Sequence, residues 1–173
     1  MDLKSFIRDV AGFPKEGIVF RDITPLLKDA AAFQEAVRAL AAPFRDEDAE
    51  LVLGAEARGF ILGGAVACEL GAGFVPVRKV GKLPAETIEQ SYELEYGTST
   101  LAMHLDAVRA GQRVLLVDDL LATGGTMAAC ARMVEALGGE VVACAFLVEL
   151  SFLNGRDALR PYRVVSLIEY ESE

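Results

Sequence analysis

Residues 114–126 read VLLVDDLLATGGT, and this stretch is the most informative about the fold of the whole chain. An apolar run of the kind found in buried parallel strands ends in two adjacent carboxylates, Asp118 and Asp119, and a glycine turn (residues 122–126) then leads into an apolar pattern of helical period. Backbone amides in a glycine turn at a helix N-terminus bind phosphate, and carboxylates accept hydrogen bonds from vicinal sugar hydroxyls. The stretch therefore predicts a strand–turn–helix unit that binds a ribose phosphate.

The composition is that of a folded globular protein. The chain has 173 residues, of which 53% are hydrophobic and 25% charged, so we expect one domain with a well-covered core over residues 1–173. No apolar stretch approaches the length of a membrane span and no signal peptide is recognisable, so we expect a cytoplasmic protein without a membrane partner. The formal net charge of −9 argues against binding to nucleic acid, which needs a basic face.

Cysteine and histidine offer little chemistry. Cys68, Cys130 and Cys144 lie inside apolar segments and form no CxxC pair, so we expect all three to be small buried hydrophobic residues. His104 is the single histidine, and it has no neighbouring nucleophile or ligand cluster in the sequence, so it is predicted to be non-functional. The sequence also lacks the GxGxxG, GxSxG and HExxH motifs and zinc-ligand spacing.

Strand and helix patterns alternate along the chain. Strands are predicted at residues 51–55, 74–77, 114–118, 141–148 and 164–168. Helices are predicted near residues 2–10, from Pro25 to about residue 40, over residues 60–70 and over residues 126–137. This alternation predicts an α/β fold with a mostly parallel central sheet flanked by helices. Residues 79–100 are longer than an ordinary connection, and such loops are usually lids or hairpin excursions.

Three loops follow predicted strands and should converge on one edge of the sheet. They are residues 54–59 (GAEARG), 78–82 (RKVGK, here called the basic turn) and 118–126. In an open α/β sheet, ligands bind outside the carboxyl ends of the strands. Arg58 in the first loop has a planar guanidinium that suits pairs of diphosphate oxygens. The three loops together therefore predict a site for a phosphorylated sugar.

Each element also has a plainer interpretation. Asp118 and Asp119 could be solvated acids at a strand end, Arg58 a surface cation, and the basic turn an ordinary solvated turn. A Walker B strand also ends in an Asp, which holds Mg²⁺, but it needs a GxxxxGK[ST] partner that is absent from this sequence. Glu93 and Glu95, taken alone, are more typical of surface charges than of catalysts.

The motifs together resemble the type I phosphoribosyltransferases. VLLVDDLLATGGT is similar to their phosphoribosyl-diphosphate motif, and RKVGKLPAETIEQSYELEYG and VFRDITPLL resemble the adenine-specific branch of that family. The resemblance runs from about residue 6 to the C-terminus and includes GAEARGF and LVELSFLNGR. It implies the type I fold, with a small N-terminal hood over about residues 1–30 and a mobile catalytic loop over about residues 79–100.

The resemblance implies a reaction and its components. The 5-phosphoribosyl group of 5-phosphoribosyl 1-diphosphate would pass to N9 of adenine, which would give AMP and diphosphate. Mg²⁺ would be held mainly by substrate oxygens, with no dedicated protein ligands, because Mg²⁺ rarely uses an all-protein cage. The family also implies a homodimer. Two other functions stay open: transfer to another purine base such as xanthine or hypoxanthine, and a non-catalytic regulator that senses the sugar diphosphate.

Roles for individual residues are carried over from the same resemblance. Asp118 and Asp119 would bind the ribose hydroxyls. The 5′-phosphate would be held by Ala122, Thr123, Gly124, Gly125 and Thr126. The diphosphate would be held by Arg58, Arg78, Lys79 and Lys82. The adenine pocket would use Val19, Phe20, Arg21 and Leu150. Glu95, with Tyr96 beside it, would be the catalytic carboxylate of the mobile loop, and Arg58 would also act in catalysis.

The chain departs from the family pattern in two places. Glu56-Ala57 stands where the family often has Asp-Ser before the arginine, and Val80 stands where a further basic residue is often found. Both departures concern the details of diphosphate binding. The resemblance also implies a non-proline cis peptide in the loop that holds the diphosphate.

Overall fold

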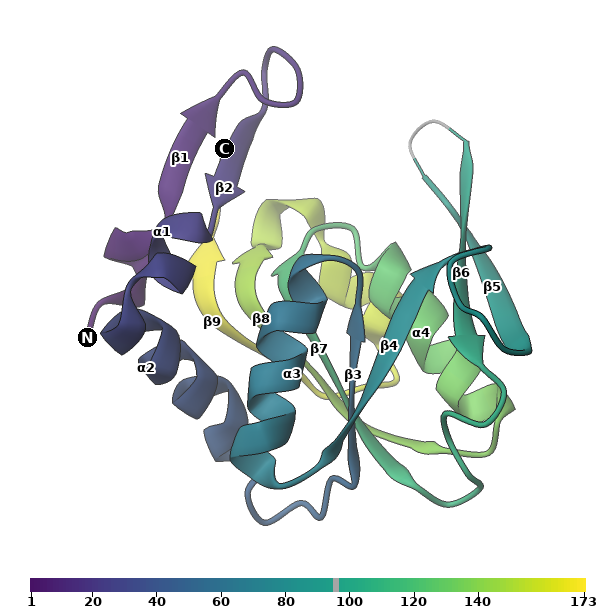
Figure 1. The fold of residues 1–173 in the computed structure, drawn as a ribbon. Coiled ribbons are helices and arrows are strands. Elements are labelled where there is room, and N and C mark those ends of the chain that lie inside the picture. Colours follow the sequence, from purple (N-terminus) through teal and green to yellow (C-terminus); the bar gives the residue numbers. More distant parts are fainter. Residues whose placement is uncertain (95–96) are drawn as a thin grey trace.

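The centre of the molecule is a mostly parallel sheet, as the sequence predicts (Figure 1). The computed structural model describes residues 1–94 and 97–173, and the strands of the sheet within these residues lie in the order β5-β6-β4-β3-β7-β8-β9. The parallel strands are β3 (Leu51–Ala55), β4 (Gly73–Lys79), β7 (Arg113–Leu121), β8 (Glu140–Leu150) and β9 (Val164–Tyr170). The antiparallel strands are β5 (Thr87–Glu93) and β6 (Thr98–His104).

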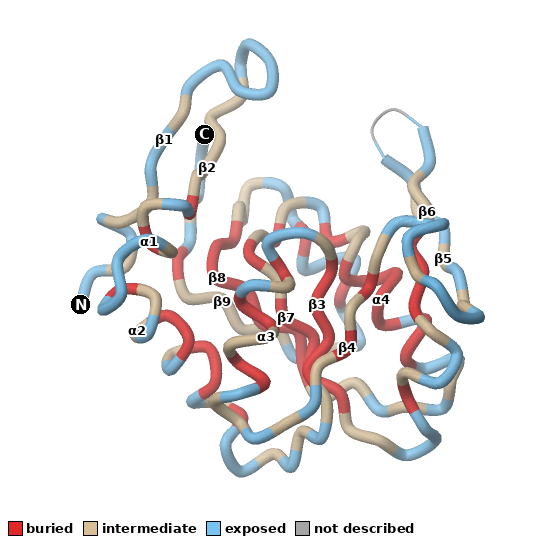
Figure 2. Tube along the Cα trace, in the orientation of Figure 1, coloured by how far each residue is buried: buried red, intermediate tan, exposed pale blue. Residues whose placement is uncertain are grey.

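Helices cover both faces of this sheet. They are α1 (Thr24–Lys28), α2 (Ala30–Ala41), α3 (Arg58–Leu70) and α4 (Gly125–Ala136). Alternation along β7 sends Leu115 and Val117 into the core cluster shared with α2 and α3, and Val114 and Leu116 into the cluster shared with α4. Figure 2 shows the resulting buried centre, with red concentrated on the middle strands. Because both faces of β7 are covered, its sequence is continuously apolar rather than alternating.

The N-terminal segment differs from the helix expected near residues 2–10. A short 3-10 helix (Leu3–Phe6) is followed by β1 (Arg8–Ala11), which pairs antiparallel with β2 (Val19–Asp22). Leu3, Phe6 and Ile7 pack against the core next to α2, which explains their helix-like spacing. The backbone beyond Ile7 pairs with β2 instead of continuing a helix, so the prediction of one helix here was wrong.

The helix predicted after Pro25 is divided into α1 and α2. Asp29 has an extended backbone, and its carboxylate accepts hydrogen bonds from the amides of Ala31 (3.1 Å) and Ala32 (2.9 Å). Aspartate is among the preferred residues at such an N-cap, because its side chain satisfies amides that have no partner within the helix. The side chain of Asp29 therefore begins a new helix where the hydrophobic pattern alone predicted a continuous one.

Two hairpins rise from the edge at which the parallel strands end. Figure 1 shows β1 and β2 on one side of this edge and the β5–β6 hairpin on the other. Residues 79–100 therefore contain a regular hairpin, in which Tyr92 pairs with Ser99 and Glu93 with Thr98. None of the described helices has both the length and the apolar character needed to cross a membrane.

The cysteines follow the sequence expectation at two of three positions. Cys130 and Cys144 are buried, and burial raises the pKa of the Cys144 thiol to about 12. Cys68 is exposed, so its predicted burial was wrong. It lies in α3, where Val66 and Ala67 face the sheet while Cys68 points to the solvent side. Because α3 is apolar on most of its faces, its sequence did not show that the position of Cys68 faces solvent.

A close backbone approach fixes the loop between β3 and α3. A Cβ atom added to Gly54 would lie 2.4 Å from the carbonyl oxygen of Gly59, so only glycine fits at this position of β3. Gly64, on α3, has no atom within 4 Å of the corresponding position. The first glycine is required by packing, whereas the second only adds freedom to the unfolded chain.

We expect the two glycines to respond oppositely to alanine. Gly54→Ala should lower the free energy of unfolding by about 1–3 kcal/mol, because the added methyl group forces the loop away from β3. Gly64→Ala should raise the free energy of unfolding by about 0.5–1 kcal/mol, because alanine favours the helix. Urea denaturation of both variants measures these changes, and equal effects of the same sign would contradict the packing argument.

Candidate functional site

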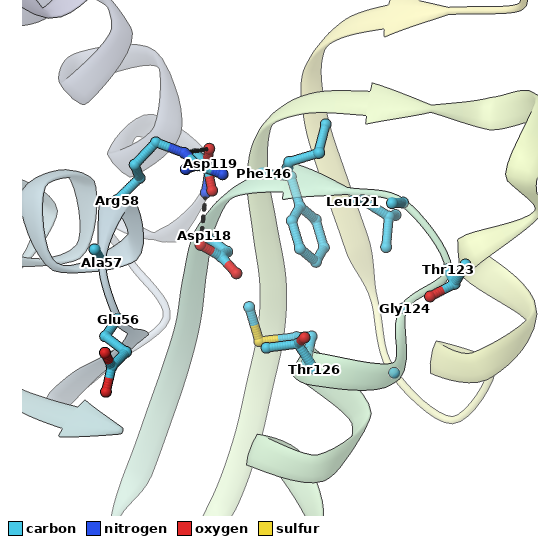
Figure 3. Close-up of a pocket in the computed structure, with 14 residues that line it drawn as sticks. Glu56, Ala57, Arg58, Asp118, Asp119, Leu121, Thr123, Gly124, Thr126 and Phe146 are labelled. Atoms are coloured by element: carbon cyan, nitrogen blue, oxygen red, sulfur yellow. Dashed lines mark hydrogen bonds and ion pairs between the residues drawn. The ribbon is translucent and has the colours of Figure 1, made fainter. Parts of the chain in front are cut away.

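A cavity of about 270 Å³ lies at the carboxyl end of β7 (Figure 3). Its lining is formed by residues 56–58 after β3, by residues 118–127 and by Phe146 of β8. Two of the three loops predicted from the sequence therefore meet here directly. The third, the basic turn at residues 78–82, lies outside the lining but is bonded to Glu56 at its rim.

The glycine turn forms one wall of the cavity and begins α4. Gly124 is the N-cap residue, has a φ of 84° and carries no side chain that could cap the helix. A Cβ atom at this position would lie 2.4 Å from the carbonyl oxygen of Gly155, so a side chain is excluded by packing as well as by conformation. The first amides of α4 and the positive end of its dipole are therefore directed at the cavity without a competing side-chain cap. This wall can bind a phosphate group.

Asp118 and Asp119 form the floor and reach different neighbours. Asp119 continues the series of β7 residues that face α3, and its carboxylate forms an ion pair with the guanidinium of Arg58 (Figure 3). The Asp119 side chain is almost buried, with 7% of the residue exposed. The amide of Asp119 donates a hydrogen bond of 2.9 Å to Asp118 Oδ1, which orients the second carboxylate. Two acceptors and one fixed cation thus share a small space.

The electrostatics of these groups are coupled. Burial and the negative charge of Asp119 together raise the pKa of Asp118 well above its usual value. Burial alone would lower the pKa of Arg58, but its hydrogen bond and charge interaction with Asp119 more than offset that effect and raise it. Arg58 is therefore a permanent cation, and Asp118 is a carboxyl group whose ionisation is opposed by its surroundings.

Glu56 links the cavity to the basic turn. Its carboxylate accepts a hydrogen bond from the Lys79 amide (2.8 Å) and pairs with Lys82 Nζ (3.1 Å) and Arg78 Nε (3.5 Å). The Lys79 amide, followed by the two cationic side chains, lowers the pKa of Glu56. In the sequence, Glu56 stands out only as a departure from the family pattern, so this role was missed. Its position two residues before Arg58 was the available signal.

The loop around Glu56 also has the expected backbone geometry. The peptide bond between Glu56 and Ala57 is cis, as the family resemblance implies. Lys79 and Lys82 are held at this loop through Glu56, and Arg78 Nη1 donates to the Lys82 carbonyl oxygen at 3.5 Å. The predicted cationic residues therefore lie together, next to the cavity that Arg58 lines.

The residues predicted to hold a base lie beside the cavity rather than in its lining. Phe20, on β2, places its ring with the centroid 5.6 Å from the guanidinium carbon of Arg58 and in edge contact with Phe13 at 5.2 Å. Arg21 points elsewhere, because its guanidinium pairs with Asp9 at 2.7 Å and lies 4.0 Å from the centre of the Tyr170 ring.

Val19 and Leu150 are the other two residues predicted to hold a base. The amide of Val19 donates to Glu173 Oε2 at 3.0 Å, so it faces away from β1 and toward an acceptor. Leu150 ends β8 and packs, half-buried, against the core cluster of α2 and α3. The structure thus brings Phe20 next to Arg58, whereas the side chain of Arg21 is engaged outside the cavity.

Two predictions made for other residues have different outcomes. Glu95 and Tyr96 lie outside the described residues, so their catalytic roles stay predictions. His104 accepts a hydrogen bond of 3.4 Å from the Ala85 amide at the far end of β6 and does not line the cavity. Within residues 1–94 and 97–173, no group of three or more His, Cys, Asp or Glu side chains is placed to hold a metal ion.

Comparison with known proteins identifies close relatives. A family model described as "Phosphoribosyl transferase domain" matches residues 26–171. An adenine phosphoribosyltransferase of Alkaliphilus oremlandii (strain OhILAs) is 58% identical over 171 residues, which are 99% of this chain and 99% of that protein. The crystal structure of adenine phosphoribosyltransferase from Thermoanaerobacter pseudethanolicus has a TM-score of 0.95 at 54% identity and covers 98% of each chain. That of the Saccharomyces cerevisiae protein, complexed with D-2,5-dideoxy-2,5-imino-altritol 1,6-bisphosphate and adenine, has a TM-score of 0.89 at 40% identity over 94% of each chain.

The raised pKa of Asp118 makes a prediction about stability. At pH 8 the unfolded chain ionises this side chain freely, whereas burial and the charge of Asp119 oppose its ionisation in the folded protein, so Asp118→Asn should unfold at a higher temperature than the wild type. Below the raised pKa the folded protein keeps this carboxyl group protonated, so the penalty shrinks as the pH falls toward the ordinary pKa of an aspartate and disappears below it. The difference in Tm between the two proteins should therefore shrink with decreasing pH. Thermal unfolding monitored by circular dichroism between pH 8 and pH 5 measures it.

Asp119→Asn is the matched control for this experiment. It removes the partner of Arg58, so its Tm should lie below that of the wild type at pH 8. An Asp118→Asn variant that is less stable than the wild type at pH 8, or a Tm difference that does not change with pH, would contradict the raised pKa of Asp118.

Proposed function

The chain belongs to the phosphoribosyltransferase family and to its adenine-specific branch, and we propose that it transfers the 5-phosphoribosyl group of 5-phosphoribosyl 1-diphosphate to N9 of adenine, giving AMP and diphosphate in purine salvage. One observation carries this proposal: the glycine turn, the two carboxylates and Arg58 line a single cavity. The glycine turn offers a binding site for a phosphate, the two carboxylates offer acceptors for sugar hydroxyls, and Arg58 offers a cation for a leaving diphosphate. The neighbouring Phe20 offers a face for a planar base.

The sugar phosphate is positioned by the two halves of the 114–126 stretch. We assign the 5′-phosphate to the amides and hydroxyls of residues 122–126, where the helix terminus favours an anion. We assign the ribose hydroxyls to Asp118 and Asp119, whose carboxylates line the same cavity. Hydrogen bonds from hydroxyls favour the ionised form of Asp118 and oppose the effect of its burial.

The leaving group is assigned to Arg58 and the basic turn. Displacement at C1 of the ribose passes through an oxocarbenium-like state, and negative charge builds on the departing diphosphate. Arg58, Arg78, Lys79 and Lys82 stabilise this charge. The side chains of Arg58, Arg78 and Lys82 pair with Asp119 or Glu56, and Glu56 also accepts from the Lys79 amide, so binding the diphosphate would exchange these carboxylate partners for phosphate oxygens. Because the carboxylates already orient these cations before the substrate binds, less conformational entropy is lost when the substrate orders them.

The base is assigned to the β2 side of the site. Phe20 stacks on the purine, backbone groups of Val19 and Arg21 bind its edge, and Leu150 closes the opposite face. Support for the backbone role is that the Val19 amide already donates to an acceptor outside the β1–β2 pairing. The side chain of Arg21 pairs with Asp9, which leaves only its backbone to face a base.

Proton transfer is assigned to Glu95 on the basis of the family resemblance. Adenine must lose the proton on N9 as it attacks, and a carboxylate at the reacting centre accepts it in synthesis and returns it in the reverse reaction. Tyr96 accompanies Glu95 in the sequence LEYG. A loop that covers the site would also exclude water, which would otherwise hydrolyse the activated sugar.

Mg²⁺ and the remaining assignments are proposed on the same premise. Mg²⁺ would be held mainly by substrate oxygens, close to the two carboxylates that line the cavity, and would neutralise charge on the diphosphate. We further propose a cytoplasmic homodimer, with residues 1–30 as the hood and residues 79–100 as the catalytic loop of one domain.

A base-selectivity assay tests the proposed function. Purified protein with 5-phosphoribosyl 1-diphosphate and Mg²⁺ should convert adenine to AMP, with kcat/KM at least about a thousandfold above that for hypoxanthine, guanine or xanthine. A 6-oxopurine leaves groups that read the exocyclic amine unpaired, and such mismatches are strongly rejected. Preferred turnover of an oxopurine would overturn the choice of base, and binding of the sugar diphosphate without turnover of any base would favour a regulator.

The ribose assignment has its own test. Asp119→Asn should weaken binding of 5-phosphoribosyl 1-diphosphate about tenfold or more, because hydrogen bonds to a charged acceptor contribute about 1.5–3 kcal/mol. Isothermal titration calorimetry measures the Kd, with Asp106→Asn, an exposed carboxylate outside the cavity lining, as the control. An unchanged Kd for Asp119→Asn would remove that residue from the sugar site.

A further inference from the structure

Tyr92 contacts the glycine turn from outside the cavity. The hydroxyl of Thr126, in the first turn of α4, donates a hydrogen bond of 3.0 Å to the phenol oxygen of Tyr92 on β5. Thr126 lines the cavity, whereas Tyr92 does not. The tyrosine therefore lies directly behind a residue of the proposed phosphate site.

Packing holds the Tyr92 ring in this place. A Cβ atom added to Gly125 would lie 3.0 Å from Cδ2 of Tyr92, so the ring lies close against the backbone of the glycine turn. Ile88 and Tyr92 lie on the same face of β5 and pack against the core cluster that contains α4. Ser91, between them, faces outward and bonds to Thr100 Oγ1 at 2.8 Å. The phenol is thus presented to Thr126 by an edge strand that pairs with β6 and packs one face against α4.

The hydrogen bond between Thr126 and Tyr92 must reverse its direction when a phosphate binds to Thr126. A threonine hydroxyl has one hydrogen to donate and two lone pairs to accept with, and a phosphate dianion only accepts. Thr126 must therefore direct its hydrogen to the phosphate, and it can no longer donate to Tyr92. The phenol also has one hydrogen, so the contact persists with its direction reversed: Tyr92 donates to Thr126, and Thr126 donates to the phosphate. Hydrogen bonds in such a chain polarise and strengthen one another.

We propose that Tyr92 is a positioning residue for the 5′-phosphate, acting through the hydroxyl of Thr126. This inference rests on the proposed function, in which Thr126 binds that phosphate. Tyr92 fixes the Thr126 rotamer in the free protein and makes its hydroxyl a better donor once the phosphate is present. Because the phosphate is unchanged in the reaction, this stabilisation is equal in the ground state and the transition state, and it belongs to KM rather than to kcat.

Tyr92→Phe tests the proposal because it keeps the ring and removes only the hydroxyl. We expect the Kd for ribose 5-phosphate, measured by calorimetry, to rise about three- to tenfold, as for the loss of one hydrogen bond. The KM for 5-phosphoribosyl 1-diphosphate should rise in parallel, while kcat, the KM for adenine and the Kd for inorganic diphosphate stay within twofold of the wild type. Ser91→Ala, which removes a hydroxyl from the outer face of the same strand, should change none of these constants.

A double-mutant cycle with Thr126→Val separates the possible outcomes. If Tyr92 acts through Thr126, Tyr92→Phe will have no further effect on the Kd for ribose 5-phosphate once Thr126 is valine. An unchanged Kd for Tyr92→Phe, or effects of the two substitutions that simply add, would overturn the proposal. If Thr126→Val raises this Kd and Tyr92→Phe does not, only the role of Tyr92 fails. If Thr126→Val itself has no effect, the phosphate assignment of the proposed function fails.

Discussion

The parallel pairing of β3 with β7 is the constraint on which the site depends. Gly54 lies beside Val117 in this register, so the loop after β3 and the carboxylates after Val117 leave the sheet at neighbouring points. Arg58 then begins α3 next to Asp119, and their ion pair joins the two strand ends. The tight contact between Gly54 and Gly59 keeps the intervening loop short and fixed. A slip of one residue in the pairing would turn Asp119 toward α4 and leave Arg58 without its partner.

The charged groups of the site pair with one another. Arg58 is paired with Asp119, and Glu56 interacts with all three cationic residues of the basic turn. Charges that are oriented but internally compensated cost less to maintain than isolated ones, because each loses less solvation than an unpaired ion would. A substrate that carries both anionic oxygens and hydroxyl donors can replace each internal partner by one of its own groups. Under the proposed function, this exchange would favour a ligand that is a sugar and a diphosphate together.

The parts of the fold that were predictable are those whose pattern is local. The continuous apolar run of β7 and the glycine turn before α4 identified the central strand and the helix that follows it. The errors fall where packing from elsewhere decided the outcome. The spacing of Leu3, Phe6 and Ile7 satisfied a helical period, yet the next residues formed a strand against β2. Cys68 belongs to an apolar helix, but its side of the helix meets solvent.

By itself, the sequence determined which chemical groups are present and the loops that carry them, because a strand end, a cap and a glycine turn are read from adjacent residues. It also identified the family, and with it the sugar and the base. Only the tertiary structure decided which groups meet: Glu56 with Lys82, Arg58 with Asp119, and Thr126 with Tyr92 are 26, 61 and 34 positions apart. Such contacts depend on strand order and on register, which no local pattern encodes. The glycine turn could thus be predicted to bind phosphate from its own residues, whereas the contact with Tyr92 behind it could be found only once β5 was placed against α4.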